Sequence, residues 1–236
     1  MITKTSFMSS NHHTDAIFQE KRKPKNPIKF QVQLNEEQKE TKSIILVNDI
    51  TVITGQAGSG KTLVAVQTAL DLLFNKEVEK IIIARPVVTA KEEIGFLPGG
   101  IKEKLDPFVA PIYDNAYRVY DKEKVDMYFE RGQIEIVPFA FMRGRNFSNA
   151  FIIVDEAQNV TDPQMEMVIS RLCKGSKMVI VGDTSQVDLK NKKDSGMYFL
   201  SKQVAGSIPG VASVVLKTNH RHPIVESVLN MYKEHM

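Results

Sequence analysis

The short stretch of residues 55–62 contains the first group of candidate functional residues. Its sequence, Gly-Gln-Ala-Gly-Ser-Gly-Lys-Thr, follows the pattern G-x-x-x-x-G-K-[ST] of loops that wrap phosphate groups. The glycines let the backbone curl around a polyphosphate, Lys61 can reach the β- and γ-phosphates, and Thr62 can ligate Mg²⁺. The stretch therefore predicts a site for a nucleoside triphosphate such as ATP. The residues predicted to bind it are Gly55, Gln56, Ala57, Gly58, Ser59, Gly60, Lys61 and Thr62.

Two adjacent carboxylates, Asp155 and Glu156, form the second candidate group. They follow the apolar run 151–154, so they would emerge at the carboxyl end of a strand, on the same sheet edge as the phosphate loop. There we expect Asp155 to hold Mg²⁺, and Glu156 to orient and deprotonate the attacking water. With Lys61, these carboxylates would make the site hydrolytic. A charge pair at a helix N-terminus is the alternative interpretation.

Two glutamines are candidates for reading the nucleotide. Gln186 ends the turn Gly-Asp-Thr-Ser-Gln after the apolar run 178–181, where its amide would lie beside the γ-phosphate and distinguish ATP from ADP. An incidental turn residue is the alternative. Gln38 lies seventeen residues before Gly55, where helicase-like ATPases read the base, and an amide can both donate to and accept from adenine. Its alternative is a capping role, because Asn35 precedes it in a capping-box pattern.

These side chains need a framework that brings several strand ends together. Short runs rich in β-branched residues predict strands buried on both faces, and the apolar-periodic run 63–74 after the phosphate loop predicts a helix. With right-handed crossovers, such strands form an α/β fold with a doubly wound, mostly parallel sheet flanked by helices. The predicted strands are residues 51–54, 81–84, 134–137, 151–154, 178–181 and 211–216.

Length and composition limit the number of domains and the class of protein that the chain can form. The 236 residues suit one α/β domain, which we place at residues 27–236, with a helical insertion at about residues 95–126. Residues 1–26 are polar and predict a basic, disordered tail. No apolar run is long enough to span a membrane, neither end carries a recognisable targeting signal, and a single cysteine suits a reducing compartment. These features predict a cytoplasmic protein.

The net charge of +3 arises at the N-terminus. Residues 1–30 hold six of the 31 basic residues and two of the 28 acidic ones, which leaves 25 basic and 26 acidic residues elsewhere. The basic segment could help to hold an anionic polymer or could simply be solvated. Overall charge alone does not favour a nucleic acid partner.

Several uncommon motifs occur in one order along the chain. The phosphate loop, Asp155–Gln158 and Gly182–Gln186 together resemble the first RecA-like domain of superfamily-one helicases. A closer likeness is to the PhoH-like family, named for phosphate-starvation-inducible proteins, and it spans about residues 28–234. The motifs that carry this likeness are Ala84–Val87, Ile94–Gly99, Glu103–Pro107, Phe141–Arg145, Val154–Asn159, Ser195–Gly196 and Arg221–Pro223.

The resemblance implies a cytoplasmic ATPase with one RecA-like P-loop NTPase domain that uses ATP and Mg²⁺. Relatives often form hexameric rings, and some are linked to RNA unwinding and others to an attached nuclease domain. We therefore expect a homo-oligomer, with a ring hexamer favoured, that acts on RNA or single-stranded nucleic acid as a helicase-like motor. The rival hypothesis is an ATP-dependent switch or assembly factor that acts on a protein partner. A kinase is disfavoured because Glu156 and Gln186 favour a water nucleophile.

Cations in the loops that follow strands are candidates for contacts to nucleic acid phosphates. Those loops lie at the carboxyl edge of the sheet, where ligands bind, and the planar guanidinium group matches the geometry of a phosphate. Intramolecular ion pairs are the alternative. Phe139, Phe141 and Phe147 could stack on bases or could belong to the core. The candidate cations are Arg85, Lys91, Arg143 and Arg145.

Arg221 resembles an arginine finger. The sequence contains no second RecA-like domain against which this residue could close, so we expect a neighbour in a head-to-tail ring to supply Arg221 to the γ-phosphate that Lys61 holds. A structural ion pair is the alternative.

Overall fold

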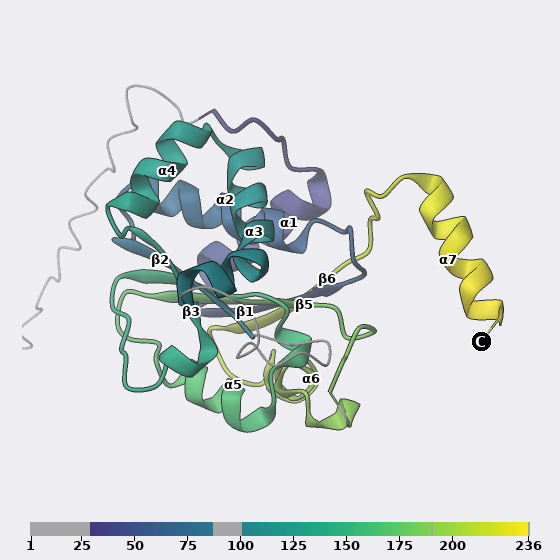
Figure 1. Cartoon of the computed structure of the whole chain (residues 1–236). Coiled ribbons are helices and arrows are strands. Elements are labelled where there is room, and N and C mark those ends of the chain that lie inside the picture. Colours follow the sequence, from purple (N-terminus) through teal and green to yellow (C-terminus); the bar gives the residue numbers. More distant parts are fainter. Residues whose placement is uncertain (1–28, 87–100, 190, 236) are drawn as a thin grey trace, which may run out of the picture.

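A parallel six-stranded sheet forms the centre of the protein, whose computed structural model describes residues 29–86, 101–189 and 191–235. Its strands are β1 (Ile50–Gly55), β2 (Lys80–Arg85), β3 (Ile134–Pro138), β4 (Ala150–Val154), β5 (Lys177–Gly182) and β6 (Val211–Leu216). Their order across the sheet is β3-β2-β4-β5-β1-β6, and all of their pairings are parallel (Figure 1). Each predicted strand lies within an observed one, and the predicted doubly wound α/β class is confirmed.

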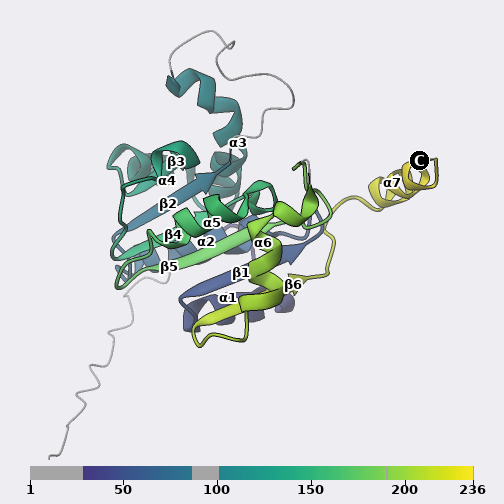
Figure 2. The same ribbon diagram turned by 90° about the horizontal axis from the view of Figure 1, so that it is seen from below.

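The helices occupy both faces of the sheet. They are α1 (Glu36–Val47), α2 (Lys61–Phe74), α3 (Ile101–Val119), α4 (Lys122–Glu130), α5 (Asp162–Ile169), α6 (Gly196–Phe199) and α7 (Pro223–His235). Figure 1 shows α1 to α4 on one face and α5 and α6 on the other, while α7 projects from the body in both views (Figures 1 and 2). The predicted helical insertion contains α3 and α4, although α4 runs four residues beyond residue 126. Residues 95–100 and the predicted tail lie outside the described residues.

The inner strands β1, β2, β4 and β5 are largely apolar and buried because both of their faces are covered, whereas the edge strands β3 and β6 are only partly buried. In β1, Ile53 packs into the cluster formed with α1 to α4, whereas its neighbour Val52 packs into the cluster formed with α5 and α6. Ile153 and Ile152 divide between the same two clusters in β4. This alternation follows from the two-residue period of a strand. The resulting rigid sheet fixes where the strand ends, and the side chains that follow them, lie.

Helix α1 begins as its sequence predicts. The side chain of Asn35 accepts a hydrogen bond from the Gln38 backbone N–H, and the Gln38 side chain accepts one from the Asn35 backbone N–H. This capping box satisfies two of the donors that a helix N-terminus leaves unpaired. It also fixes the Gln38 side chain, whose exposed fraction is 4%.

Within the described part of the chain, no helix combines the length and the apolar composition that crossing a lipid bilayer requires.

Candidate nucleotide site

The phosphate loop connects β1 directly to α2, as the sequence predicts. Gly60 is the N-cap of α2, and its φ of +83° lies in the left-handed region that glycine adopts readily. A Cβ at this position would lie 2.5 Å from Gln38 Nε2, so a side chain at residue 60 would displace Gln38. Gln38 therefore packs against the N-terminus of α2, and the free backbone N–H groups of a helix N-terminus favour anions.

A cavity of about 410 Å³ opens beside the loop. This volume lies within the range of small-ligand sites. Residues predicted from separate motifs meet on its walls, because the motifs follow strands whose carboxyl ends share one edge of the sheet. The predicted residues that line it include Gln38, Lys61, Thr62, Asp155, Glu156 and Gln186.

Lys61 lies folded over its own loop. Its Nζ donates to the carbonyl oxygens of Gly55, at 2.7 Å, and Gln56, at 2.9 Å. Burial lowers the pKa of the Lys61 ammonium, while the negative charges of Asp183, Glu156 and Asp155 oppose this shift. The phosphates of a nucleotide would add negative charge that favours the ammonium form.

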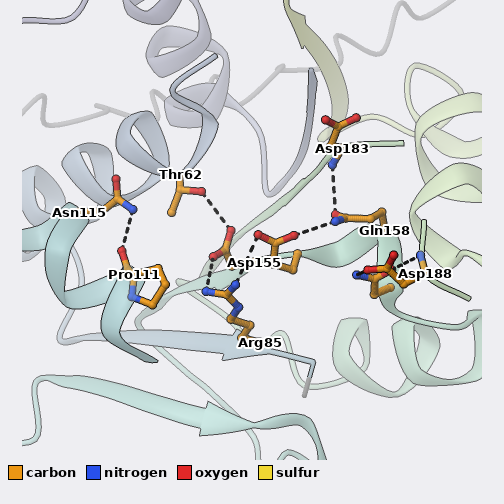
Figure 3. A network of polar contacts seen from close by, with 10 residues as sticks. Thr62, Arg85, Pro111, Asn115, Asp155, Gln158, Asp183 and Asp188 are labelled. Carbon is orange, nitrogen blue, oxygen red and sulfur yellow. Dashed lines mark hydrogen bonds and ion pairs between the residues drawn. The ribbon is translucent and has the colours of Figure 1, made fainter. Parts of the chain in front are cut away.

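Thr62 and Asp155 meet where the sequence predicts the Mg²⁺ ligands. Thr62 Oγ1 donates to Asp155 Oδ1 at 3.1 Å (Figure 3). Burial raises the pKa of the Asp155 carboxyl, and the neighbouring charge of Glu156 raises it further. A hydroxyl and one carboxylate fit Mg²⁺, which typically takes its other ligands from water and substrate phosphates. When bound, the ion would neutralise charge on the β- and γ-phosphates.

Glu156 occupies an unusual backbone position for a residue with a side chain. Its φ is +53°, in the left-handed region, directly after β4. The Gln158 Nε2 group donates to Glu156 Oε2 at 2.7 Å. Gln158 is 1% exposed, and its Oε1 accepts from the Asp183 backbone N–H at 3.1 Å. The carboxylate that is predicted to activate water is thus linked to the strand end of β5.

Asp183 continues this link to the phosphate loop. Its Oδ2 accepts from the Ala57 backbone N–H at 2.9 Å, and its Oδ1 accepts from the N–H and the hydroxyl of Ser185. The sequence motifs predicted no specific role for Gln158 or Asp183. The signal was present in the sequence, because both are polar residues that follow apolar strands, but only the fold shows that they bridge adjacent strand ends.

Gln38 is both a capping residue and a wall of the cavity. Its Nε2 donates to the Ser59 carbonyl at 3.4 Å and lies 3.3 Å from His220 Nε2. The same histidine nitrogen lies 3.2 Å from Asn35 Nδ2, and the His220 backbone N–H donates to the Gly58 carbonyl. His220 also lines the cavity.

Arg221 lies against the phosphate loop of its own chain. A Cβ on Gly58 would come 2.6 Å from Arg221 Cγ, and the positive charge of Arg221 contributes to lowering the pKa of Lys61. The expected supply of Arg221 by a neighbouring chain stays a prediction, but the side chain already lies beside the phosphate loop of its own chain. The reason is that the segment after β6 is held on α1, where Glu37 accepts from the backbone N–H groups of Lys217 and Thr218.

Two of the arginines that were predicted to contact nucleic acid form ion pairs within this chain. Arg85 lies 3.8 Å from Asp155 Oδ2 and 3.5 Å from Glu156 Oε1. Arg145 forms two hydrogen bonds with Glu135, at 2.7 and 2.8 Å, and stacks over Phe147. The alternative of intramolecular ion pairs therefore describes both.

The other candidates differ in position. Arg143 is exposed, and Lys91 lies outside the described residues. Phe139 and Phe147 are buried in the core, as the alternative interpretation held, whereas Phe141 is 55% exposed.

Helix α3 adds Asn115 and Arg118 to the cavity wall, which the sequence did not predict.

Comparisons with known proteins agree with these motifs. The family model described as PhoH-like protein matches residues 32–233. A PhoH-like protein of Synechocystis sp. is 44% identical over 188 residues, covering 79% of this chain and 57% of that protein. A PhoH-like protein of Bacillus subtilis is 44% identical over 187 residues, covering 78% of this chain and 58% of that protein. The chain thus spans little more than half the length of these relatives.

Solved structures that resemble the chain include a Pif1 helicase from Candida albicans, with 15% identity and a TM-score of 0.43, covering 85% of this chain and 43% of that one. Another is the large terminase from a thermophilic bacteriophage, with 11% identity and a TM-score of 0.49, covering 84% of this chain and 50% of that one. Because both scores lie below 0.5, the fold assignment rests on the sheet order and the phosphate loop. The extent of the family match, together with the motifs in the cavity, shows that the chain belongs to the PhoH-like protein family.

Proposed function

We propose that this protein binds and hydrolyses ATP with Mg²⁺ and uses the reaction to act on RNA or single-stranded nucleic acid in the cytoplasm. The observation that carries the proposal is the cavity in which the phosphate loop, the two carboxylates and both glutamines meet. Lys61 would hold the phosphates, Thr62 and Asp155 the metal ion, and Glu156 the attacking water. Gln38 would contact the adenine and Gln186 the γ-phosphate.

The nucleic acid part of the proposal rests on family membership and on one exposed pair. Phe141 and Arg143 follow β3 at the carboxyl edge of the sheet, and both are exposed. An exposed aromatic residue and an exposed arginine two positions apart suit a single strand, whose bases stack and whose phosphates attract cations. Arg143 has no hydrogen-bond or ion-pair partner among the described residues, so its charge is available to a phosphate.

Steady-state ATP hydrolysis, measured with and without single-stranded RNA and DNA at two salt concentrations, tests this function. We expect stimulation by at least one polymer and weaker stimulation at high salt. Hydrolysis that neither polymer changes would favour the rival function, an ATP-dependent switch that acts on a protein partner.

Arg143→Ala and Arg131→Ala make a matched pair for the contact surface. Arg131 is exposed too, but it lies between α4 and β3, at the opposite edge of the sheet. Arg143→Ala should weaken polymer binding and reduce the slope of log affinity against log salt by about 1. Arg131→Ala should leave both unchanged, and equal effects of the two variants would contradict the assignment.

We further propose that identical chains assemble into a ring, with a hexamer favoured, as the family resemblance implies. Light scattering with and without ATP measures the mass of the assembly. A mass of one chain under both conditions would contradict the ring.

A further inference from the structure

Arg85 occupies a special place relative to the two carboxylates. It is the last residue of β2, which pairs with β4, and the Asp155 backbone N–H donates to the carbonyl of Ala84 at 2.9 Å. The sheet register therefore sets Arg85 beside Asp155 and Glu156. The order β2-β4-β5-β1 puts it on the far side of these carboxylates from the phosphate loop.

The Glu156 carboxylate is held at both of its oxygens. Arg85 Nη2 lies 3.5 Å from Oε1, and Gln158 Nε2 lies 2.7 Å from Oε2 (Figure 3). Both partners are well packed, since the Arg85 side chain is 21% exposed and Gln158 is 1% exposed. The Glu156 side chain itself is 41% exposed, so packing alone does not fix its direction. Its direction is set mainly by the ion pair with Arg85 and the hydrogen bond from Gln158.

Further contacts show that Arg85 is directed toward the carboxylates. Its Nη1 is buried, makes no hydrogen bond to any of the described residues and lies 3.8 Å from Asp155 Oδ2. A buried guanidinium nitrogen without a hydrogen bond is costly, so the surrounding charge must offset that cost. One cation facing two adjacent anions reduces their mutual repulsion.

Gln158 contacts the Glu156 carboxylate at the oxygen that Arg85 does not contact. A Cβ on Gly182 would lie 2.6 Å from Gln158 Oε1, so a larger residue there would push the amide away. Through Asp183, the amide of Gln158 is tied to Ala57 in the phosphate loop. Glu156 is thus fixed between the end of β2 and the loop that would hold the nucleotide.

We propose that Arg85 is a positioning residue for Glu156, which it holds together with Gln158 in the direction needed to activate water. The inference rests on the proposed hydrolysis of ATP. It replaces the predicted role of Arg85 in contacting nucleic acid. A base that points wrongly loses the rate that orientation supplies, and an error of about 1 Å can cost about 10²-fold. Nucleotide affinity does not depend on this direction.

The test compares wild type, Arg85→Gln, Arg85→Lys, Glu156→Gln and the double variant Arg85→Gln/Glu156→Gln in the full chain. ATP turnover, ATP affinity by calorimetry and melting temperature are measured for each. Arg131→Gln serves as the control for loss of an arginine charge at an exposed site.

We expect Arg85→Gln to lower kcat about 10-fold to 10²-fold with ATP affinity changed less than about twofold. Arg85→Lys should recover part of the loss, because it keeps the charge but not the planar fork. In the Glu156→Gln background, Arg85→Gln should cost nothing more, because the residue acts through Glu156.

Several results would overturn the inference. One is an unchanged or raised kcat in Arg85→Gln, and another is a further full loss in the double variant. If Arg85→Gln does not fold, Arg85→Lys decides, and a wild-type kcat in that variant contradicts the proposal. A wild-type protein that does not hydrolyse ATP would instead contradict the proposed function.

Discussion

Gln38 shows at the residue scale how one side chain serves structure and a binding site together. Its carbonyl oxygen completes the capping box of α1, while its amide nitrogen contacts Ser59 and His220 on the cavity wall. The two alternatives that the sequence left open are therefore compatible. The capping role is confirmed, and the adenine contact stays a prediction.

Gln38→Ala tests the adenine contact. Losing one base-specific hydrogen bond should reduce the preference for ATP over GTP about fivefold to tenfold, measured by competition binding. Asn35→Ala is the control, because it also breaks the capping box and should cost about 1 kcal/mol of stability, yet it keeps the Gln38 amide. An undiminished preference for ATP in Gln38→Ala would show that the residue only caps the helix.

The sequence predicted which residues lie in the cavity better than it predicted what they contact. Lys61, Asp155 and Glu156 could be placed because a phosphate loop and a strand end have a local signature. The partners of Arg85 and Arg145 could not be predicted. Asp155 lies 70 residues from Arg85 and meets it because β2 and β4 are neighbours, and Glu135 lies 10 residues from Arg145, on the strand that precedes its loop. A single sequence contains no direct signal of that neighbourhood.

At the scale of elements, the strands were predictable and their order was not. Each strand is a short run rich in β-branched residues, so the local pattern is sufficient. The position of β4 between β2 and β5 emerges only in the fold, and it decides that Arg85 faces Glu156 while Gln158 faces Asp183. The segment after β6 was also unpredicted, since Glu37 of α1 holds it through backbone contacts.

The ion pair between Arg145 and Glu135 links the loop after β3 to that strand, and it predicts that the stability of the fold depends on pH. Hydrogen bonds from Arg145 hold the pKa of the Glu135 carboxyl below its ordinary value of 4.5. A lowered pKa means that the pair stabilises the fold above pH 4.5 and loses this effect as the pH falls through the folded-state pKa. Since both side chains are more than a third exposed, the effect is small.

Glu135→Gln should therefore lower the melting temperature slightly at neutral pH and not at strongly acidic pH. Thermal unfolding across this range measures the difference from wild type. Glu130→Gln, at an exposed position at the end of α4, is the control and should show no such pH dependence. A difference that grows on acidification would contradict the sign of the pKa shift.

At the scale of the whole molecule, the question is whether Arg221 acts on the ATP site of its own chain or on that of a neighbouring chain. The structure places this side chain beside Gly58 in the same chain, whereas the family resemblance implies supply by a neighbour. Arg221→Ala should lower turnover about 10²-fold, as expected when one donor to transition-state charge is lost.

Mixing Arg221→Ala protein with Lys61→Ala protein distinguishes supply within a chain from supply between chains. Neither variant has an intact loop and an intact arginine in one chain, so we expect the mixture to recover no activity. Recovery, with subunit exchange shown by labelled chains, would mean that Arg221 acts on the neighbouring site as the resemblance implies.

We propose that one cavity binds ATP through Lys61 and hydrolyses it through Glu156. The most direct measurement is ATP binding by calorimetry and ATP turnover with Mg²⁺, in wild type, Lys61→Ala and Glu156→Gln. We expect Lys61→Ala to lose both binding and turnover, and Glu156→Gln to bind ATP like wild type while its turnover falls about 10²-fold or more. Equal loss of ATP binding in the two variants, or full turnover in Glu156→Gln, would contradict the account.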